Sequence, residues 1–235
     1  MTNRIAIIPA RGGSKRIPNK NVRDFCGRPM VAHVLDAARD SGLFHKIHVS
    51  TDSNQVAAVV DSLGFVVDFM RPSELADDHT PIMPVLKFVL EQYADRGLKF
   101  DQVWLLMACA PNLASDDLRQ ASGMLEKASP RTSLVSISEY PVPIEWAFAR
   151  NPSGLLEALQ PGMFARRSQD IEPRYYDTGT FAVFSADTVL RSQGASSDSE
   201  YLGFVLPKGS AVDIDTETDW SAAEALFHMG RSPSR

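Results

Sequence analysis

The sequence lacks the features that membrane proteins and secreted proteins need. No apolar stretch approaches the roughly 20 consecutive residues that cross a bilayer. Cysteine is scarce: Cys26 and Cys109 lie far apart among 235 residues and show no metal-ligand spacing. Strand-like sequence begins almost at the N-terminus, so we expect no signal peptide. These absences predict a cytoplasmic protein with reduced thiols and no membrane partner.

The motifs of several enzyme classes are also missing. Neither the Walker pattern nor the dinucleotide fingerprint G-x-G-x-x-G is present. The five histidines form no cluster, and neither a Ser-His-Asp triad nor a nucleophilic cysteine can be recognised. The chemistry therefore needs no covalent intermediate. The net charge of −5 argues against nucleic acid as a partner.

Short apolar runs alternate with amphipathic segments along most of the chain. This alternation predicts an α/β fold with a mostly parallel central sheet and helices on both faces, in a single domain over residues 1–229. The expected strands are 4–9, 46–50, 65–69, 102–107, 132–138, 178–184 and 201–206. The expected helices are 29–41, 53–63, 80–96, 115–127 and 217–228, with Ser115 as a candidate N-cap.

Two segments depart from this pattern. Residues 139–165 are rich in proline, glycine and aromatic side chains, which suits an arm that leaves the sheet. Exposed Trp146 and Phe148 would favour a homodimer contact, whereas packing onto their own domain is an equally weighted alternative. The tail 230–235 is expected to be disordered.

The first 28 residues contain most of the informative chemistry. They hold seven Lys or Arg residues and one acid, Asp24, a net charge of +6, so the remaining residues carry −11. Gly12 and Gly13 lie among these cations, directly after the first strand. Glycine lets backbone N–H groups approach phosphate oxygens that the cations neutralise, so the loop predicts a polyanion site. The alternative is a solvated basic turn.

A second signal lies near the C-terminus. Asp213 and Asp215 alternate along an extended segment, so their carboxylates share one side. Two hard oxygen donors beside a phosphate site suit Mg²⁺. The alternative is a helix start capped by Thr216 or Asp215.

Polar residues also follow other predicted strands. Asp52 is expected mainly to cap the next helix, or else to reach the ligand crevice. Arg71 can meet a phosphate, a base or a carboxylate, with a surface ion pair to Glu74 or Asp78 as the alternative. The run from Arg166 to Pro173 contains residue types that can bind an acidic sugar, although such runs are more often charged surface loops.

Taken together, these motifs resemble a known family. They are the loop Ile8–Asn21, the strand ends Val49–Asp52 and Arg71–Ala76, and the segment Asp213–Thr216 with Asp219 and Trp220. Over Ile5 to about Leu226 the chain resembles the acylneuraminate cytidylyltransferases, the CMP-sugar-acid synthetases. The segments Asp24–Pro29, Arg167–Pro173 and Tyr176–Gly179 look most like those of pseudaminic acid cytidylyltransferases.

The resemblance implies a Rossmann-like nucleotide-diphospho-sugar transferase fold and a homodimer. The implied reaction transfers CMP from CTP to the anomeric hydroxyl of a nonulosonic acid, most closely pseudaminic acid, and releases pyrophosphate with Mg²⁺ as cofactor. By family motif, Arg11 and Lys20 would hold the phosphates, and with Asp215 they would be the catalytic residues. Backbone at Ala10, Gly12 and Gly13 would line the same loop, and Asn21 and Arg71 would contact cytidine. Asp213 and Asp215 would bind Mg²⁺, and Arg167 and Gln169 would lie in the sugar pocket.

The segment Met107–Asn112 departs from the family pattern. Relatives usually read Pro-Thr-Ser/Ala-Pro there, so Cys109 replaces a hydroxyl-bearing threonine with a weaker hydrogen bonder. This departure keeps other acceptors open: sialic acid, legionaminic acid or Kdo. A non-catalytic nucleotide-binding module is the alternative from another class, against which the intact Arg11, Lys20, Asp213 and Asp215 argue.

Overall fold

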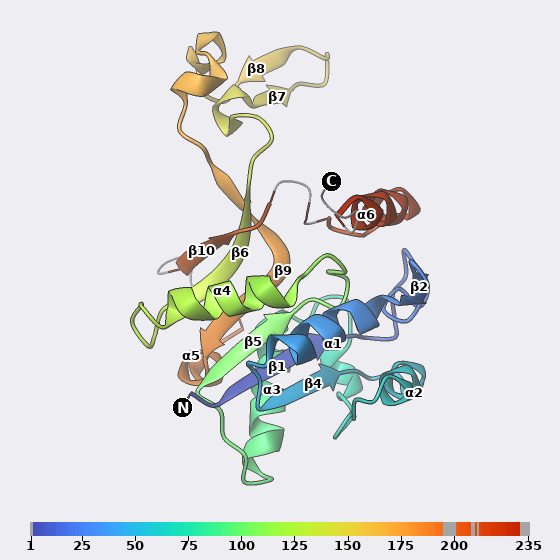
Figure 1. Ribbon diagram of the computed structural model, residues 1–235. Coiled ribbons are helices and arrows are strands. Elements are labelled where there is room, and N and C mark those ends of the chain that lie inside the picture. Colours follow the sequence, from blue (N-terminus) through green and yellow to red (C-terminus); the bar gives the residue numbers. More distant parts are fainter. Residues whose placement is uncertain (1, 195–200, 208–209, 211, 231–235) are drawn as a thin grey trace.

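A six-stranded sheet organises the body of the protein (Figure 1). The computed structural model describes residues 2–194, 201–207, 210 and 212–230. The order across the sheet is β10 (Tyr201–Val205), β6 (Ser133–Glu139), β9 (Tyr175–Ser185), β5 (Gln102–Leu106), β1 (Arg4–Pro9) and β4 (Lys46–Ser50). In this sheet β9 is antiparallel to both of its neighbours, and the other pairs are parallel. The predicted α/β class with a mostly parallel sheet is confirmed.

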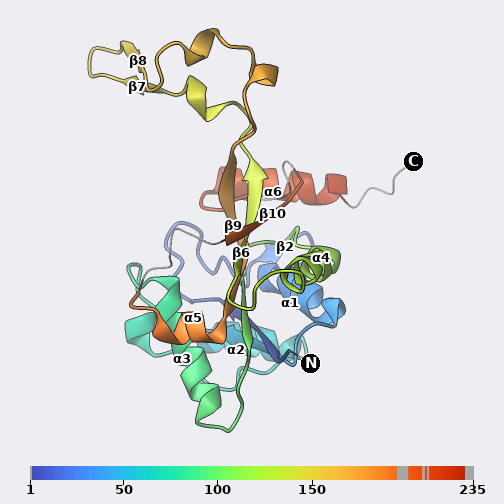
Figure 2. The same ribbon diagram turned by 90° about the vertical axis from the view of Figure 1, so that its left-hand side faces the viewer.

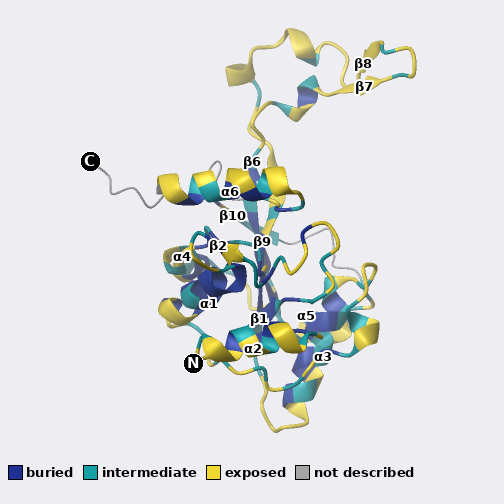
Figure 3. Cartoon of the chain, turned by 90° about the vertical axis from the view of Figure 1, so that its right-hand side faces the viewer, coloured by how far each residue is buried: buried dark blue, intermediate teal, exposed yellow. Residues whose placement is uncertain are grey.

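Helices cover both faces of the sheet, which explains why β1 reads as an unbroken apolar run. Ala6 and Ile8 pack with α1 (Met30–Ser41) and α4 (Ser115–Leu125) on one face. Ile5 and Ile7 point the other way and pack with α3 (Ile82–Ala94) and the short α5 (Ala186–Arg191). A strand buried on both faces needs apolar side chains at every position. Figure 3 shows this buried centre between the helical layers.

Helix boundaries follow the capping chemistry of the sequence, with one correction. Helix α1 begins after Pro29, and α2 (Asn54–Ser62) is capped by Ser53, whose Oγ accepts a hydrogen bond from the Val56 N–H. The prediction that Ser115 caps α4 is wrong. The N-cap is Ala114, whose N–H donates to the Asp117 carboxylate at 3.0 Å.

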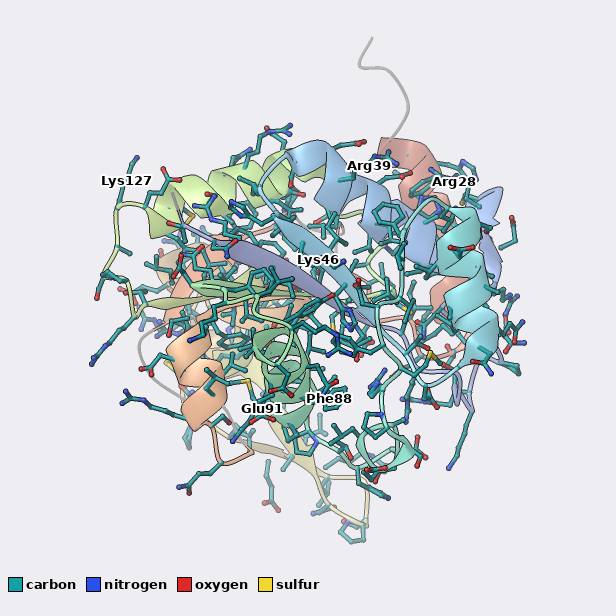
Figure 4. All side chains as sticks on the ribbon, turned by 90° about the horizontal axis from the view of Figure 1, so that it is seen from below. Arg28, Arg39, Lys46, Phe88, Glu91 and Lys127 are labelled. Carbon is teal, nitrogen blue, oxygen red and sulfur yellow. The ribbon has the colours of Figure 1, made fainter. Side chains whose placement is uncertain are left out.

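The predicted strand 65–69 is also wrong. The segment does not pair with the sheet, so β4 is the edge strand, and side-chain contacts hold the segment instead of ladder hydrogen bonds. The Asp68 carboxylate accepts hydrogen bonds from Lys46 at 2.9 Å and from the Tyr93 hydroxyl at 2.6 Å. Phe69 stacks on His48 with ring centroids 4.5 Å apart. Figure 4 looks onto this part of the body, with Lys46 labelled.

Residues between β6 and β9 form an arm that projects from the body (Figure 2). Its base closes where the Tyr140 N–H donates to the Arg174 carbonyl at 2.9 Å. It contains a hairpin of β7 (Phe148–Arg150) and β8 (Leu156–Ala158) and the short turns η2 (Ile144–Trp146), η3 (Met163–Ala165) and η4 (Ser168–Asp170). The projection thus continues beyond residue 165, where the sequence led us to end it.

Helix α6 (Glu217–Gly230) lies apart from the two helical layers. Its Trp220, Ala223 and Phe227 pack against Phe25 and Met30, near the small hairpin of β2 (Asp24–Phe25) and β3 (Arg28–Pro29). The 3-10 turn η1 (Ser73–Leu75) completes the described elements. None of the described helices has the length and apolarity needed to span a membrane. Of the tail 230–235, Gly230 ends α6 and the rest lies outside the described residues.

Candidate active site

A cavity of about 880 Å³ opens at the edge of the sheet where β1 and β5 end and β9 begins. Its size falls within the usual range of small-molecule sites. The N-terminal basic loop, the segments 107–113 and 176–180, and the stretch before α6 line it. Because β9 runs antiparallel to β5, its pairing with the end of β5 begins at Phe181, and its earlier residues lie beyond the end of β5 at this edge.

The basic loop contributes one wall and is held by acidic partners. The Arg11 guanidinium lies 2.7 Å from the Asp78 carboxylate and donates to the Asp77 carbonyl at 2.9 Å. Lys15 reaches the other Asp78 oxygen at 2.5 Å, although its side chain is 80% exposed. These cations hold the pKa of Asp78 below its ordinary value, Lys15 first and then Arg11. Lys15, for which a solvated charge was the alternative, is largely exposed and forms an ion pair with Asp78.

Lys20 and Arg16 join this wall to the two-carboxylate segment. The Lys20 ammonium donates to the Ile214 carbonyl at 2.6 Å and lies 3.6 Å from Asp215 Oδ1. Arg16 lies 2.7 Å from Asp215 Oδ2. Residues almost 200 positions apart in sequence thus meet in the cavity, and Asp215 is neutralised by two cations.

Helix capping leaves both carboxylates of that segment available to the cavity. The cap of α6 is formed by Thr216, whose Oγ1 accepts from the Asp219 N–H while the Asp219 carboxylate accepts from the Thr216 N–H at 2.8 Å. Asp213 and Asp215 both line the cavity. Two carboxylates in a roomy site fit a Mg²⁺ ion that keeps several waters or phosphate oxygens. No cluster of three or more metal-ligating side chains is found in the described part of the chain.

Arg71 and Asn21 are buried polar residues of the lining, each 7% exposed. The Arg71 guanidinium donates to the Ser50 carbonyl at 2.8 Å and to the Leu75 carbonyl at 3.3 Å, so the expected alternative of an ion pair with Glu74 or Asp78 is not what the structure shows. Burial lowers the pKa of Arg71 from its ordinary value. The Arg71 Nε has no hydrogen-bond partner among the described residues.

The segment Met107–Asn112, which departs from the family pattern, lines the cavity. The thiol of Cys109 donates to the Asn21 side-chain oxygen at 3.2 Å, and the Asn21 amide donates to the Arg11 carbonyl at 2.9 Å. Burial raises the pKa of Cys109 to about 11, and the nearby carboxylates of Asp213 and Asp215 act in the same direction. A thiol that stays protonated at neutral pH is a poor nucleophile, as the sequence suggested.

The glycines of the loop do not face the cavity. The Gly12 N–H donates to the Asp52 carboxylate at 3.0 Å, and Gly12 packs against Ser53. Asp52 therefore secures the loop, and the expectation that it mainly caps α2 is wrong because Ser53 does so. Ala10, Gly12 and Gly13 are not among the residues that line the cavity. Ala10 is buried and donates to the Ser50 carbonyl at 2.9 Å.

The structure also keeps two predicted sugar-binding residues away from this cavity. Arg167 and Gln169 lie on the arm, both exposed, and neither lines the described cavity. The Arg167 guanidinium pairs with Asp170 at 2.9 Å. Of the predicted residues, Arg11, Lys20, Asn21, Arg71, Asp213 and Asp215 are the ones brought together.

Three lining features were not assigned a role from the sequence. Asp78 pairs with the loop cations, and Arg16 pairs with Asp215. Asp177 lies near the start of β9, and its carboxylate accepts from the Gly179 N–H at 2.8 Å. In the sequence, only the position of Asp177 just before the predicted strand 178–184 pointed to the site. Counted together, the charged lining residues are four cations and five acids. The cavity is thus a mixed-charge site, which suits a cation bound together with a polyanion.

Comparisons with known proteins give a consistent result. The sequence model of a family described as cytidylyltransferase matches residues 5–146. The chain is 33% identical over 227 residues to the pseudaminic acid cytidylyltransferase of Campylobacter jejuni subsp. jejuni serotype O:2, with 96% of each chain covered. It is 30% identical over 233 residues to the CMP-N,N'-diacetyllegionaminic acid synthase of Legionella pneumophila subsp. pneumophila, with 97% of each covered. A solved CMP:2-keto-3-deoxy-manno-octonic acid synthetase complexed with CTP superposes with a TM-score of 0.71 at 18% identity, covering 97% of this chain and 100% of that one.

Proposed function

Because this chain belongs to the cytidylyltransferase family and is a nucleotidyltransferase that uses CTP, we propose that it transfers CMP to a nonulosonic acid. The acceptor we propose is pseudaminic acid, since the pseudaminic acid cytidylyltransferase is 33% identical to this chain and the legionaminic acid synthase is 30% identical. One observation carries the proposal. A single cavity gathers the loop cations, two carboxylates and a separate polar wall at 176–180, as two substrates that must meet require.

The basic wall suits the triphosphate. We assign Arg11 and Lys20 to the phosphates of CTP, where their charges stabilise the leaving pyrophosphate. Arg11 is held at the cavity by the Asp78 carboxylate, an anion that a phosphate group can replace. The side chains supply this contact, because the Gly12 N–H is already bonded to Asp52. Arg71 and Asn21 are assigned to the cytidine end.

Asp213 and Asp215 would hold the Mg²⁺ ion. Their carboxylates are the hard donors that this ion prefers, and the two basic side chains now beside Asp215 show that the position attracts positive charge. When bound, Mg²⁺ neutralises phosphate charge and lowers the pKa of a nearby hydroxyl.

The reaction follows from how these groups are placed. The anomeric oxygen of the acceptor forms a bond to the α-phosphorus, the bond from that phosphorus to the β-phosphate oxygen breaks, and the hydroxyl proton is lost to solvent or to a base. The chain contributes chiefly by positioning both substrates and stabilising charge. Asp177 also lines the cavity, and we assign its carboxylate to accept a hydrogen bond from a sugar hydroxyl.

The arm supports a homodimer. Many of its large apolar side chains are exposed, among them Leu155, Leu156, Leu159 and Phe164, each above 60%. Within the arm, the Phe164 ring contacts the rings of both Trp146 and Phe148, yet Phe148 and Phe164 remain exposed. We propose that the exposed apolar face is covered by a second copy. Arg167 and Gln169 can act on a sugar acid only if the arm meets a cavity of that second copy.

A matched pair of variants tests the dimer. Leu159→Asp places a charge on the arm, and Leu98→Asp places one on the body, where Leu98 is 48% exposed. Light scattering after size exclusion is expected to show a dimer for the wild type and Leu98→Asp, and a monomer for Leu159→Asp. A monomeric wild type, or a dimer that survives Leu159→Asp, would contradict the proposal.

The substrate is tested with a panel of acceptors. Pyrophosphate release with CTP and Mg²⁺ is measured for pseudaminic, legionaminic and sialic acids and for Kdo. We expect the highest kcat/KM with pseudaminic acid. A higher value with another acid would reassign the substrate, and CTP binding without turnover on any acid would refute the enzyme assignment.

A further inference from the structure

The residue that departs from the family pattern is tied to the phosphate-binding loop. Cys109 follows β5 in sequence, and Arg11 follows β1, yet one side chain connects them. The Cys109 sulfur lies 3.2 Å from Asn21 Oδ1, and Asn21 Nδ2 lies 2.9 Å from the Arg11 carbonyl oxygen. Two hydrogen bonds therefore link Cys109, Asn21 and Arg11, all of which line the cavity.

The direction of this chain is fixed by chemistry. A carbonyl oxygen can only accept a hydrogen bond, so the Asn21 amide nitrogen must face Arg11. The Asn21 oxygen then faces the sulfur, and the S–H group is the donor. Asn21 itself is 7% exposed, and its backbone carbonyl accepts a hydrogen bond from the Val31 N–H at 2.9 Å at the start of α1. The amide is thus held between two loops and the first turn of a helix.

We infer that Cys109 is a positioning residue for the nucleotide: by donating to Asn21 it holds the Arg11 peptide, and with it the guanidinium that meets the triphosphate. This inference rests on the proposed role of Arg11. The Asn21 side chain then stabilises the loop, and because its amide and its oxygen are both engaged, fewer of its groups remain for cytidine. The effect of the departure at Cys109 therefore falls on CTP rather than on the acceptor.

A packing role is the competing explanation. Cys109 also packs against the cluster that contains Ile17 and Ile214, so removing the sulfur affects apolar contacts as well as the hydrogen bond. Serine and alanine have similar volumes and differ by one hydroxyl group. Cys109→Ser keeps a donor at this position and Cys109→Ala does not, which separates the two roles.

The experiment measures CTP affinity by calorimetry, together with kcat and both KM values, on the full chain. A lost neutral hydrogen bond predicts about threefold to tenfold weaker CTP binding for Cys109→Ala, with the acceptor KM unchanged. Cys109→Ser is expected to bind CTP within about twofold of the wild type. In Asn21→Ala, adding Cys109→Ala is expected to cause no further loss.

Several results would overturn the inference. Cys109→Ser as defective as Cys109→Ala would indicate packing alone, and a folded Cys109→Ala with wild-type CTP affinity would show that the bond has no effect. If Cys109→Ala does not fold, Cys109→Val replaces it as the variant without a donor, and equal CTP binding by the serine and valine variants refutes the role. A wild type that fails to bind CTP would instead refute the proposed function, so the two failures are distinguishable.

Discussion

Lys20 should contribute more to the reaction than any other cation of the basic loop. Its ammonium carries three N–H donors, of which one is committed to the Ile214 carbonyl at 2.6 Å, so the others remain for a phosphate. Its side chain is 21% exposed, so its charge is less screened than that of Lys15. Losing one charged donor at a developing anion costs about 2.7–4 kcal/mol, so Lys20→Ala should lower kcat/KM for CTP about 100-fold to 1000-fold.

The assay is steady-state pyrophosphate release at several CTP concentrations. Lys15→Ala is the matched control, because Lys15 lies in the same loop but is 80% exposed, and among the described residues its ion pair is with Asp78. We expect it to remain within a few-fold of the wild type. Lys20→Met keeps the apolar stem without the charge and should match Lys20→Ala.

Protein stability must be separated from catalysis in this comparison. Lys20 also anchors the Ile214 carbonyl, so each variant is checked by thermal melting in the absence of CTP. The reasoning is refuted if Lys20→Ala, with an unchanged melting temperature, keeps kcat/KM within about threefold of the wild type. Equal losses for Lys15→Ala and Lys20→Ala would also refute it, because the two positions would then contribute only general charge.

Three further predictions concern the loop, the metal motif and the fold. Gly12→Ala places a Cβ 2.7 Å from the Cβ of Ser53, whereas the Cβ of Gly13→Ala meets no atom within 4 Å. Thermal melting should therefore show a loss of about 1–3 kcal/mol for Gly12→Ala and none for Gly13→Ala. Arg16→Ala removes a cation that competes for the metal motif, so Mn²⁺ binding without CTP, followed by electron paramagnetic resonance, should tighten. The neighbouring His48, whose Nδ1 lies 3.9 Å from the carboxylate, and the hydrogen bonds from Lys46 and Tyr93 hold the pKa of Asp68 below its ordinary value of about 3.9. The ionised Asp68 carboxylate therefore stabilises the folded protein above about pH 3.9, and this contribution is lost as the pH falls below that value. In urea unfolding, the free energy of unfolding of the wild type should decrease below about pH 4 more steeply than that of Asp68→Asn.

Local sequence patterns predicted most of the elements because those elements depend on local chemistry. Strand β1 and helix α1 begin and end close to where periodicity and capping residues place them. The prediction of a strand at 65–69 was wrong because a short apolar run can pack against the body without pairing with another strand. Pairing requires a neighbouring strand edge, and the hydrogen bonds of Asp68 hold the segment in another way.

In the candidate site, too, the sequence identified the residues of the motifs but not the residues that contact them. Motifs identified Arg11, Lys20 and the carboxylates, because phosphate and Mg²⁺ chemistry require those residue types. The partners of these residues were not predictable. Asp78 pairs with Arg11, and Cys109 pairs with Asn21, across separations that no local pattern records. The structure likewise moved Arg167 from an expected place in the cavity onto the arm, where its sugar-binding role stays a prediction.

The sequence by itself determined the fold class, the cation-rich loop and the pair of carboxylates, since composition and periodicity are local properties. Tertiary structure decided that these groups share one cavity, and that acids from distant segments balance the charge of the loop. It also decided that the Gly12 N–H serves Asp52 rather than a ligand. The physical reason is that an ion pair or hydrogen bond depends on distance in space, and only the crossovers of the sheet bring residues 11, 78, 109 and 215 within reach of one another.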